Sequence, residues 1–324
     1  MTEGKVKGAG TAEPLSNSAK FRNPLLTADG KERAWVSLKK LRTLWFNTGT
    51  LCNLTCRNCY IESSPRNDRL AYLSATEVAS YLDEIESECV DTEEIGFTGG
   101  EPFMNPEILP MLEESLHRGF RVLVLTNAMR PMMKVKTPLL LLNSRFPRQL
   151  FIRVSLDHYD RAWHEGERGE RSWAPTLAGL AWLCRNRFAA RVAGRRFSGE
   201  PDAELRAGYA RLFRAHDLQI DAFDNDQLVL FPEMEAAHDV TEITTACWGI
   251  LGVSPDTVMC ASSRMVIKRN GAAHPTVVSC TLLPYDREFE LGRSLRAASG
   301  PVRLNHPYCA QFCVLGSGSC SGKR

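Results

Sequence analysis

The sequence predicts an α/β fold built on a parallel sheet. Short apolar runs alternate with amphipathic segments from residue 41 to about residue 231, which gives roughly six βα units. The run 120–126 is almost continuously apolar, as expected for a parallel strand that is covered on both faces. Six units are too few for a closed eight-unit barrel, so an open doubly wound sheet and a partial barrel are both compatible with the pattern.

The first predicted strand is the buried run 41–47, which leads directly into a cysteine-rich loop. The next helix begins at Ser74, because Ser-Ala-Thr-Glu is a capping box and apolar residues follow it at helical spacing. A strand at 94–98 comes next. A second helix runs from about Pro106 to Gly119, a residue type that commonly ends helices.

The remaining elements continue this alternation. We predict strands at 120–126, 150–156, 188–193, 219–222 and 228–231, and helices near 139–142, 175–184 and 203–215. The first 40 residues are polar and contain several Gly and Pro residues, so we expect a flexible N-terminal tail at 1–40. A core domain at 41–235 and a smaller, cysteine-rich domain at 236–324 complete the predicted organisation.

Composition excludes several classes of protein. With 324 residues, 44% of them hydrophobic, the chain is long enough for one large domain and a smaller module. A net charge of +2 gives no indication of nucleic-acid or membrane binding. Neither a signal peptide nor a run of transmembrane length is present, so we expect a cytoplasmic protein. In a reducing cytosol, the clustered cysteines among the 11 are better explained as metal ligands or catalysts than as disulfides, whereas Cys89 and Cys184 lie on the apolar faces of predicted helices and are expected in the core.

Three cysteines lie within eight residues of one loop, at Cys52, Cys56 and Cys59. Thiolates are soft ligands that select zinc or iron–sulfur clusters. Three of them leave one coordination position open, where chemistry can take place. A zinc site completed by a distant Cys or His is an alternative, which we weigh against the second motif.

The second motif is Gly99-Gly100-Glu101-Pro102, which follows the predicted strand 94–98. Two glycines allow the backbone to approach a ligand closely, and a carboxylate can pair with an ammonium group. A zinc loop alone leaves this turn without a purpose.

Together the C-x3-C-x2-C loop and the Gly-Gly-Glu-Pro turn resemble the signature of the radical S-adenosylmethionine (radical SAM) superfamily. The resemblance implies that the three cysteines hold a 4Fe–4S cluster, whose fourth iron chelates the amino and carboxyl groups of SAM. It also implies that the Gly-Gly-Glu-Pro turn holds the methionine amino group. It favours a partial (β/α)6 TIM-like barrel that binds ligands at the carboxyl ends of its strands.

Polar residues at two further strand ends resemble family positions that contact the methionyl group or the ribose of SAM. They are Asn127 after the third strand, and Ser155 and Asp157 at the end of the fourth. The alternatives are a turn-forming asparagine and an Asx cap. Family members often have an aromatic residue before the third cysteine, where this chain has Asn58, with Tyr60 following the cysteine.

The stretch from Asp157 through His164, Arg168-Gly169 and Ser172 is similar to a family pattern. The resemblance assigns no role to His164. Arg195 lies just beyond the fifth strand, where a solvated strand-edge residue and a contact to a carboxylate of SAM or substrate are the two interpretations.

The C-terminal segment is rich in cysteine, glycine and proline. Its candidate metal ligands are Cys247, Cys260, Cys280, Cys309, Cys313 and Cys320. Between the second and third of these, the sequence predicts a hairpin that turns at Asn270-Gly271. A small segment without its own core needs a cross-link. The layout resembles the SPASM or twitch extension of radical SAM enzymes, which implies one complete auxiliary iron–sulfur cluster and leaves a second open.

The resemblance implies an oxidoreductase-type or transferase-type enzyme that cleaves SAM, forms a 5'-deoxyadenosyl radical and abstracts a hydrogen from a peptide or a small metabolite. Flavodoxin or ferredoxin would be the reductant. Peptide-modifying relatives often carry an N-terminal leader-binding domain, for which about 40 polar residues leave no room. We assign no general acid or base. The alternative is a non-enzymatic electron carrier or a zinc-stapled binding module.

Overall fold

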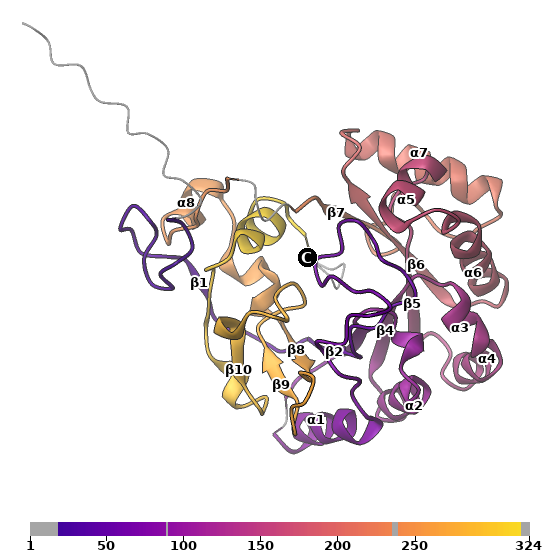
Figure 1. The fold of residues 1–324 in the computed structure, drawn as a ribbon, viewed down its shortest axis with the longest axis horizontal. Coiled ribbons are helices and arrows are strands. Elements are labelled where there is room, and N and C mark those ends of the chain that lie inside the picture. The colour runs from indigo at the N-terminus through magenta and orange to yellow at the C-terminus, as the bar shows by residue number, and fades with distance from the viewer. Residues whose placement is uncertain (1–18, 89, 235–238, 319–324) are drawn as a thin grey trace, which may run out of the picture.

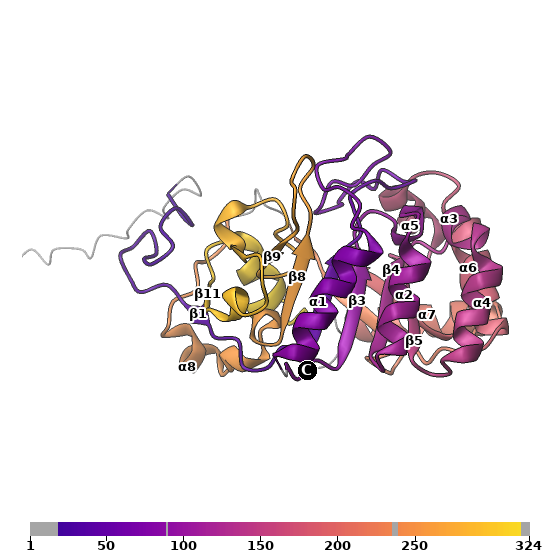
Figure 2. The same cartoon turned by 90° about the horizontal axis from the view of Figure 1, so that it is seen from below.

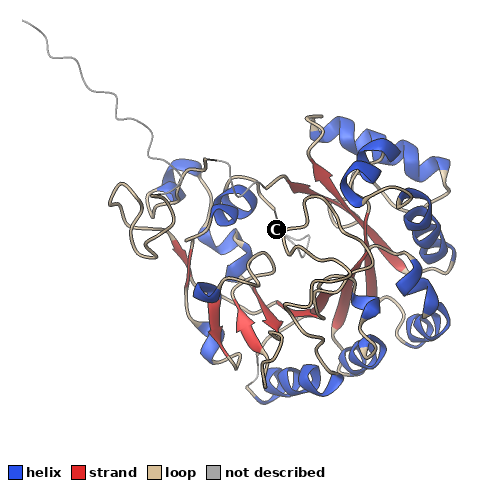
Figure 3. Ribbon diagram, viewed as in Figure 1, coloured by secondary structure: helices blue, strands red, loops and turns tan. Residues whose placement is uncertain are grey.

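The computed structural model describes residues 19–88, 90–234 and 239–318. Within these residues the main element is a nine-stranded sheet with the order β10-β9-β8-β2-β3-β4-β5-β6-β7. Neighbouring strands from β8 to β7 are parallel, and β9 and β10 are antiparallel. The helices lie along the outside of the curved sheet, as Figure 1 and Figure 3 show. The parallel strands and their outer helices form the predicted partial barrel.

The parallel strands are β2 (Thr43–Asn47), β3 (Glu94–Thr98), β4 (Arg121–Thr126), β5 (Leu150–Ser155), β6 (Ala189–Arg196), β7 (Leu228–Pro232) and β8 (Ser263–Ile267). The helices that cover them are α1 (Ala75–Ser87), α2 (Ile108–His117), α3 (Arg130–Lys134), α4 (Lys136–Arg145), α5 (Arg161–Arg168), α6 (Trp173–Arg185) and α7 (Asp202–Ala215). Figure 2 shows α1, α2, α4 and α6 on one side of the sheet. No helix of the described ranges is long and apolar enough to cross a membrane.

Local sequence explains the first of these helices. Ser74 accepts a hydrogen bond from the backbone N–H of Glu77, and the Glu77 side chain accepts one from Ser74 N, so the predicted capping box is present. The apolar face of α1 is buried against the sheet. On the opposite side of the sheet, Gly96 makes room for the fully buried Trp45, because a Cβ at Gly96 would lie 2.3 Å from the indole ring.

The C-terminal segment extends the sheet. The predicted hairpin forms: β8 pairs antiparallel with β9 (Thr276–Val278), which pairs with β10 (Glu290–Gly292). Strand β8 also pairs in parallel with β2, which local sequence could not show. A short helix, Cys309–Val314, packs against the far edge of the sheet, where the Phe312 and Phe231 ring centroids are 5.5 Å apart. The segment therefore contacts both edges of the partial barrel.

Two sequence predictions were wrong. Residues 19–40 are not a free tail: β1 (Trp35–Val36) pairs with β11 (Val302–Arg303), and buried Arg33 forms an ion pair with Glu242 at 2.5 Å. These partners come from more than 200 residues further along the chain, so composition could not reveal them. Residues 219–222 lie in a loop and not in a strand, and β7 alone occupies the sheet edge. Residues 1–18 lie outside the described residues.

Candidate active site

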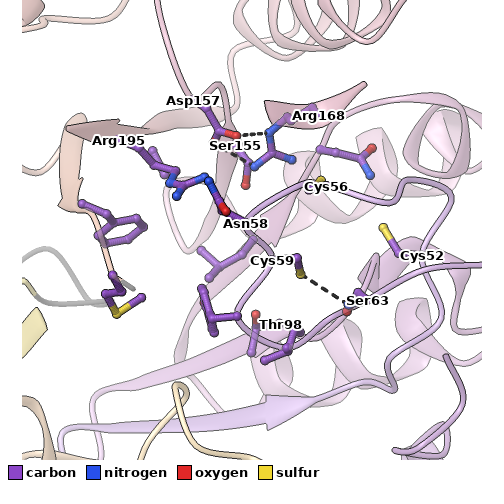
Figure 4. A pocket seen from close by; sticks show the side chains of 18 of the residues that line it. Cys52, Cys56, Asn58, Cys59, Ser63, Thr98, Ser155, Asp157, Arg168 and Arg195 are labelled. Carbon is purple, nitrogen blue, oxygen red and sulfur yellow. Dashed lines mark hydrogen bonds and ion pairs between the residues drawn. The ribbon is translucent and has the colours of Figure 1, made fainter. Parts of the chain in front are cut away.

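A cavity of ≈ 440 Å³ lies at the carboxyl ends of the parallel strands. It brings together most of the residues that the motifs predicted. Those that line it are Cys52, Cys56, Cys59, Gly99, Gly100, Asn127, Ser155 and Asp157. They come from the loop after β2 and from the ends of β3, β4 and β5, so segments far apart in the sequence meet at one place. Figure 4 shows the three thiols on one side and Asp157, Arg168 and Arg195 on another.

The three thiols of the loop differ in exposure. Cys52 is buried, whereas Cys56 and Cys59 are partly exposed. Backbone N–H groups of Leu54 and Ser63 donate to the sulfurs of Cys52 and Cys59, each at 3.4 Å. Burial raises the pKa of Cys52 to about 12, so its thiolate needs a strong positive partner. Iron supplies such a partner, and three soft donors beside a cavity fit a cluster with one open iron.

The glycine turn packs directly against the start of the cysteine loop. A Cβ at Gly99 would lie 2.5 Å from the carbonyl oxygen of Gly49, and a Cβ at Gly100 would lie 2.2 Å from that of Leu51. Gly99 also has a φ of +135°, which side chains disfavour. The glycines are thus required for the contact between the two loops, as well as for an open backbone at the cavity wall.

Glu101 does not line the cavity. Its carboxylate is buried and accepts hydrogen bonds from Thr126 Oγ1 at 2.8 Å, from Asn127 N at 2.9 Å and from Phe103 N at 3.2 Å. Burial raises the pKa of Glu101 to about 7. In this geometry the carboxylate fixes the end of β4 beside the glycine turn. Pairing of Glu101 with an ammonium group remains a prediction. The next residue, Pro102, is buried in the short helical turn Pro102–Met104.

The two other strand-end candidates combine local and cavity contacts. Asn127 Oδ1 accepts a hydrogen bond from Met129 N at 3.0 Å, which is the turn-forming geometry that the sequence left open. Its Nδ2 donates to Asn53 of the cysteine loop at 2.9 Å. Ser155 ends β5 and lines the cavity. Asn127 therefore connects the third strand end to the cysteine loop.

Buried Asp157 forms a two-point ion pair with the partly buried Arg168: the Nε–Oδ2 distance is 2.9 Å and the Nη2–Oδ1 distance is 3.0 Å. Burial opposes ionisation of Asp157, but the guanidinium outweighs it and holds the pKa of Asp157 below its usual value. Helix α5, which supplies Arg168, was missed by sequence reasoning. Its signal was Asp160, whose side chain accepts from the backbone N–H groups of Ala162 and Trp163 and caps the helix.

A second charge network borders the cavity. Arg195 donates to Glu167 at 2.8 Å and to Glu233 at 2.6 Å, so it is no solvated strand-edge residue. Asn58 also donates to Glu167, at 3.0 Å, and lines the cavity together with Tyr60. Asn58 therefore fixes the cysteine loop to α5. The aromatic residue next to the third cysteine is Tyr60, which follows Cys59 in the sequence instead of preceding it.

His164 is fully buried, and within the described residues neither ring nitrogen has a hydrogen-bond partner. Burial lowers the pKa of His164 to about 4, so the ring is neutral near pH 7. It packs edge-on against Trp173, with ring centroids 5.5 Å apart. Its place is in the packing between α5 and α6, away from the cavity.

Four C-terminal cysteines surround a second, small cavity: Cys260, Cys280, Cys309 and Cys313. All four are buried, and burial raises the pKa of Cys260 to about 12. Four soft donors at one place fit a fully ligated iron–sulfur cluster. No three His, Cys, Asp or Glu side chains of the described ranges converge as donors to a single metal ion.

The other two predicted ligands of this segment are not part of the group. Cys247 does not line the second cavity, and its sulfur instead accepts a hydrogen bond from Thr244 N at 3.4 Å. It begins α8 (Cys247–Leu251). Cys320 lies outside the described residues. The structure therefore brings together four of the six predicted ligands.

Comparisons with known proteins agree with this geometry. Residues 46–195 match the family described as the Radical SAM superfamily. The chain is 33% identical over 143 residues to the antilisterial bacteriocin subtilosin biosynthesis protein AlbA of Bacillus subtilis. That match covers 44% of this chain and 30% of AlbA.

Solved structures show the same fold. SuiB of Streptococcus suis bound to SAM has a TM-score of 0.54 at 13% identity, over 79% of this chain and 63% of SuiB. SuiB bound to the precursor peptide SuiA has a TM-score of 0.57 at 12% identity, again over 79% of this chain and 63% of SuiB. The structure named anSMEcpe, with bound AdoMet, gives 0.59 at 12% identity, over 87% of this chain and 92% of that one. This chain therefore spans less than two thirds of AlbA and SuiB.

The matched range contains the glycine turn, the strand-end residues and all three thiols of the loop. SAM and a 4Fe–4S cluster are the cofactors of that family. Residues 46–195 therefore form a radical SAM domain, and the C-terminal cysteine module adjoins its partial barrel.

Proposed function

We propose that this protein reductively cleaves SAM and abstracts a hydrogen atom from an organic substrate. The observation that carries the proposal is the single cavity lined by three thiols of one loop, the glycine turn and polar groups of three strand ends. When bound, the cluster and SAM supply a 5'-deoxyadenosyl radical as the hydrogen acceptor.

The chain itself supplies binding, orientation and shelter from water. The backbone of Gly99 and Gly100 is open to the cavity, and Ser155 and Asn127 add polar groups at the neighbouring strand ends. The pair of Asp157 and Arg168 is held rigidly by two hydrogen bonds, so its charges are fixed before any ligand enters. The C-terminal helix covers one side of the cavity and helps to exclude water from it.

We assign an auxiliary iron–sulfur cluster to Cys260, Cys280, Cys309 and Cys313. The support is the convergence of four buried thiols on one small cavity. This cluster would exchange an electron with the substrate, and flavodoxin or ferredoxin is the proposed external reductant. A single zinc ion on the same four cysteines is disfavoured, because no three donor side chains of the described residues converge on one ion position.

A peptide is the favoured substrate class. AlbA is named for the biosynthesis of a bacteriocin, and SuiB was solved with its precursor peptide. A small metabolite is the other candidate.

Anaerobically purified and iron-reconstituted protein tests the proposal. Incubation with SAM and dithionite should form 5'-deoxyadenosine, measured by chromatography. Cys56→Ala should abolish this product because it removes one of three cluster ligands. Cys184→Ala is the matched control, since Cys184 lines neither cavity. Colourless, zinc-loaded protein that does not cleave SAM would instead support the binding-module alternative.

A further inference from the structure

The cavity has two chemically different walls. Thiols, glycine backbone and polar strand ends form one wall. A second group of lining residues, which we call the apolar wall, is large and mostly aromatic: Phe231, Met234, Tyr308 and Phe312. Phe231 lies in β7, Tyr308 directly precedes the C-terminal helix and Phe312 lies within that helix. The cofactor motifs use the first wall only.

Two of the four residues of the apolar wall, Phe231 and Phe312, are tightly packed. Phe231 and Phe312 are tilted by 42°, with their ring centroids 5.5 Å apart. Phe312 is 2% exposed, and a Cβ at Gly318 would lie 2.6 Å from its ring, so the backbone packs directly on the ring. Arg196 donates to the carbonyl oxygen of Gly316 at 2.7 Å and connects this segment to β6. A preformed wall binds an apolar group without a large ordering cost.

The charged side chains beside the cavity already have partners. Arg168 is paired with Asp157, and Arg195 is paired with Glu167 and Glu233. A charged substrate side chain that entered would lose its water without gaining a free counter-charge from these described lining residues. An apolar side chain meets no such cost and gains the contact with the rings.

The apolar wall is also the partition between the two cavities. Tyr308 and Phe312, four residues apart, line the large cavity, and Cys309 and Cys313, again four apart, line the small one. Tyr308 lines both. A group that lies against Tyr308 and Phe312 is therefore separated from Cys309 and Cys313 by this helix.

We propose that the wall formed by Phe231, Met234, Tyr308 and Phe312 binds a large apolar side chain of the substrate and holds it between the SAM site and the auxiliary cysteines. The inference rests on the proposed function and names the part of the substrate that reacts. A cavity of ≈ 440 Å³ is near the lower end of small-molecule sites, roughly 300–1,000 Å³. SAM fills much of it, so the substrate contributes a side chain and not its whole chain.

Ligand-detected NMR on cluster-loaded, unreduced protein with SAM tests this inference. The probes are the capped tripeptides acetyl-Gly-Phe-Gly-amide, acetyl-Gly-Leu-Gly-amide and acetyl-Gly-Lys-Gly-amide. The phenylalanine and leucine probes should bind at least about tenfold more tightly than the lysine probe. Phe231→Ala should weaken binding of the phenylalanine probe about tenfold. Phe223→Ala is the control and should change nothing, because Phe223 is exposed and lies outside the cavity.

Met234→Glu provides a test that a general loss of structure cannot mimic. A carboxylate on the wall should reverse the order of the probes in favour of lysine. SAM binding by calorimetry confirms that each variant is folded. Equal affinities for all three probes, or an unchanged order in Met234→Glu, would overturn the inference while leaving SAM cleavage intact. Absence of SAM binding to the unmodified protein would instead contradict the proposed function.

Discussion

At the scale of single residues, the buried carboxylate of Glu101 fixes the end of β4 beside the glycine turn. The three thiols, both glycines and Ser155 all reach the cavity, because a motif fixes spacing along one loop or strand end. Glu101 belongs to the same motif but turns away into hydrogen bonds with β4. Its partners are about 25 residues away in sequence, so no local pattern could show them.

Glu101→Gln should therefore destabilise the fold. The amide keeps one acceptor oxygen, whereas the carboxylate serves three donors, so at least one buried donor loses its partner. The expected loss is about 1–3 kcal/mol in the free energy of unfolding, measured in urea. Glu204→Gln, on the first turn of α7, is the surface control. Unchanged stability with weaker SAM binding would show that the carboxylate faces the ammonium group after all.

At the scale of elements, the alternation of apolar and amphipathic segments predicted the parallel sheet, and failed where periodicity was absent or misleading. Helix α5 buries only His164 and Glu167, so it has no apolar stripe to detect. Residues 219–222 alternate like a strand, yet they form a loop in which Ile220 and Ala222 are buried. The parallel pairing of β8 with β2 joins segments about 220 residues apart, and only the assembled sheet shows it.

The docking of α5 depends on one buried ion pair, which gives a prediction at this scale. Asp157→Asn leaves the partly buried Arg168 guanidinium without its counter-charge, and should cost about 3 kcal/mol of unfolding free energy, the lower end for a buried pair. Arg161→Met, which removes an exposed pair with Glu165 on the same helix, should cost at most about 0.5 kcal/mol. Urea denaturation of the two variants measures the difference. If both variants lose equally little unfolding free energy, α5 is held by packing alone.

At the scale of the whole molecule, the C-terminal segment is part of the barrel and not an appendage. It adds β8 to one edge of the parallel sheet, and its helix packs on β7 at the other edge. The sequence predicted its hairpin and its cysteines, since both are local. It could not predict that the helix Cys309–Val314 would form a wall shared by both cavities. It could not predict either that residues 19–40 would join this segment through β1.

This arrangement predicts how the two cysteine sets respond to mutation. If Cys260, Cys280, Cys309 and Cys313 hold one cluster, Cys260→Ala/Cys280→Ala should lower the iron content by about four atoms per chain. The segment 239–318 should then become sensitive to protease, because the cluster stabilises a region that is otherwise rich in loops. SAM cleavage should survive in part, since the first cluster is bound by the loop after β2, and since β8 retains its pairing with β2.

Cys247→Ala is the matched control and should keep the full iron content, because Cys247 does not line the second cavity. Iron analysis and limited proteolysis decide the matter: equal iron loss in Cys247→Ala would place Cys247 among the ligands, and full iron in the double variant would show that packing alone folds the hairpin.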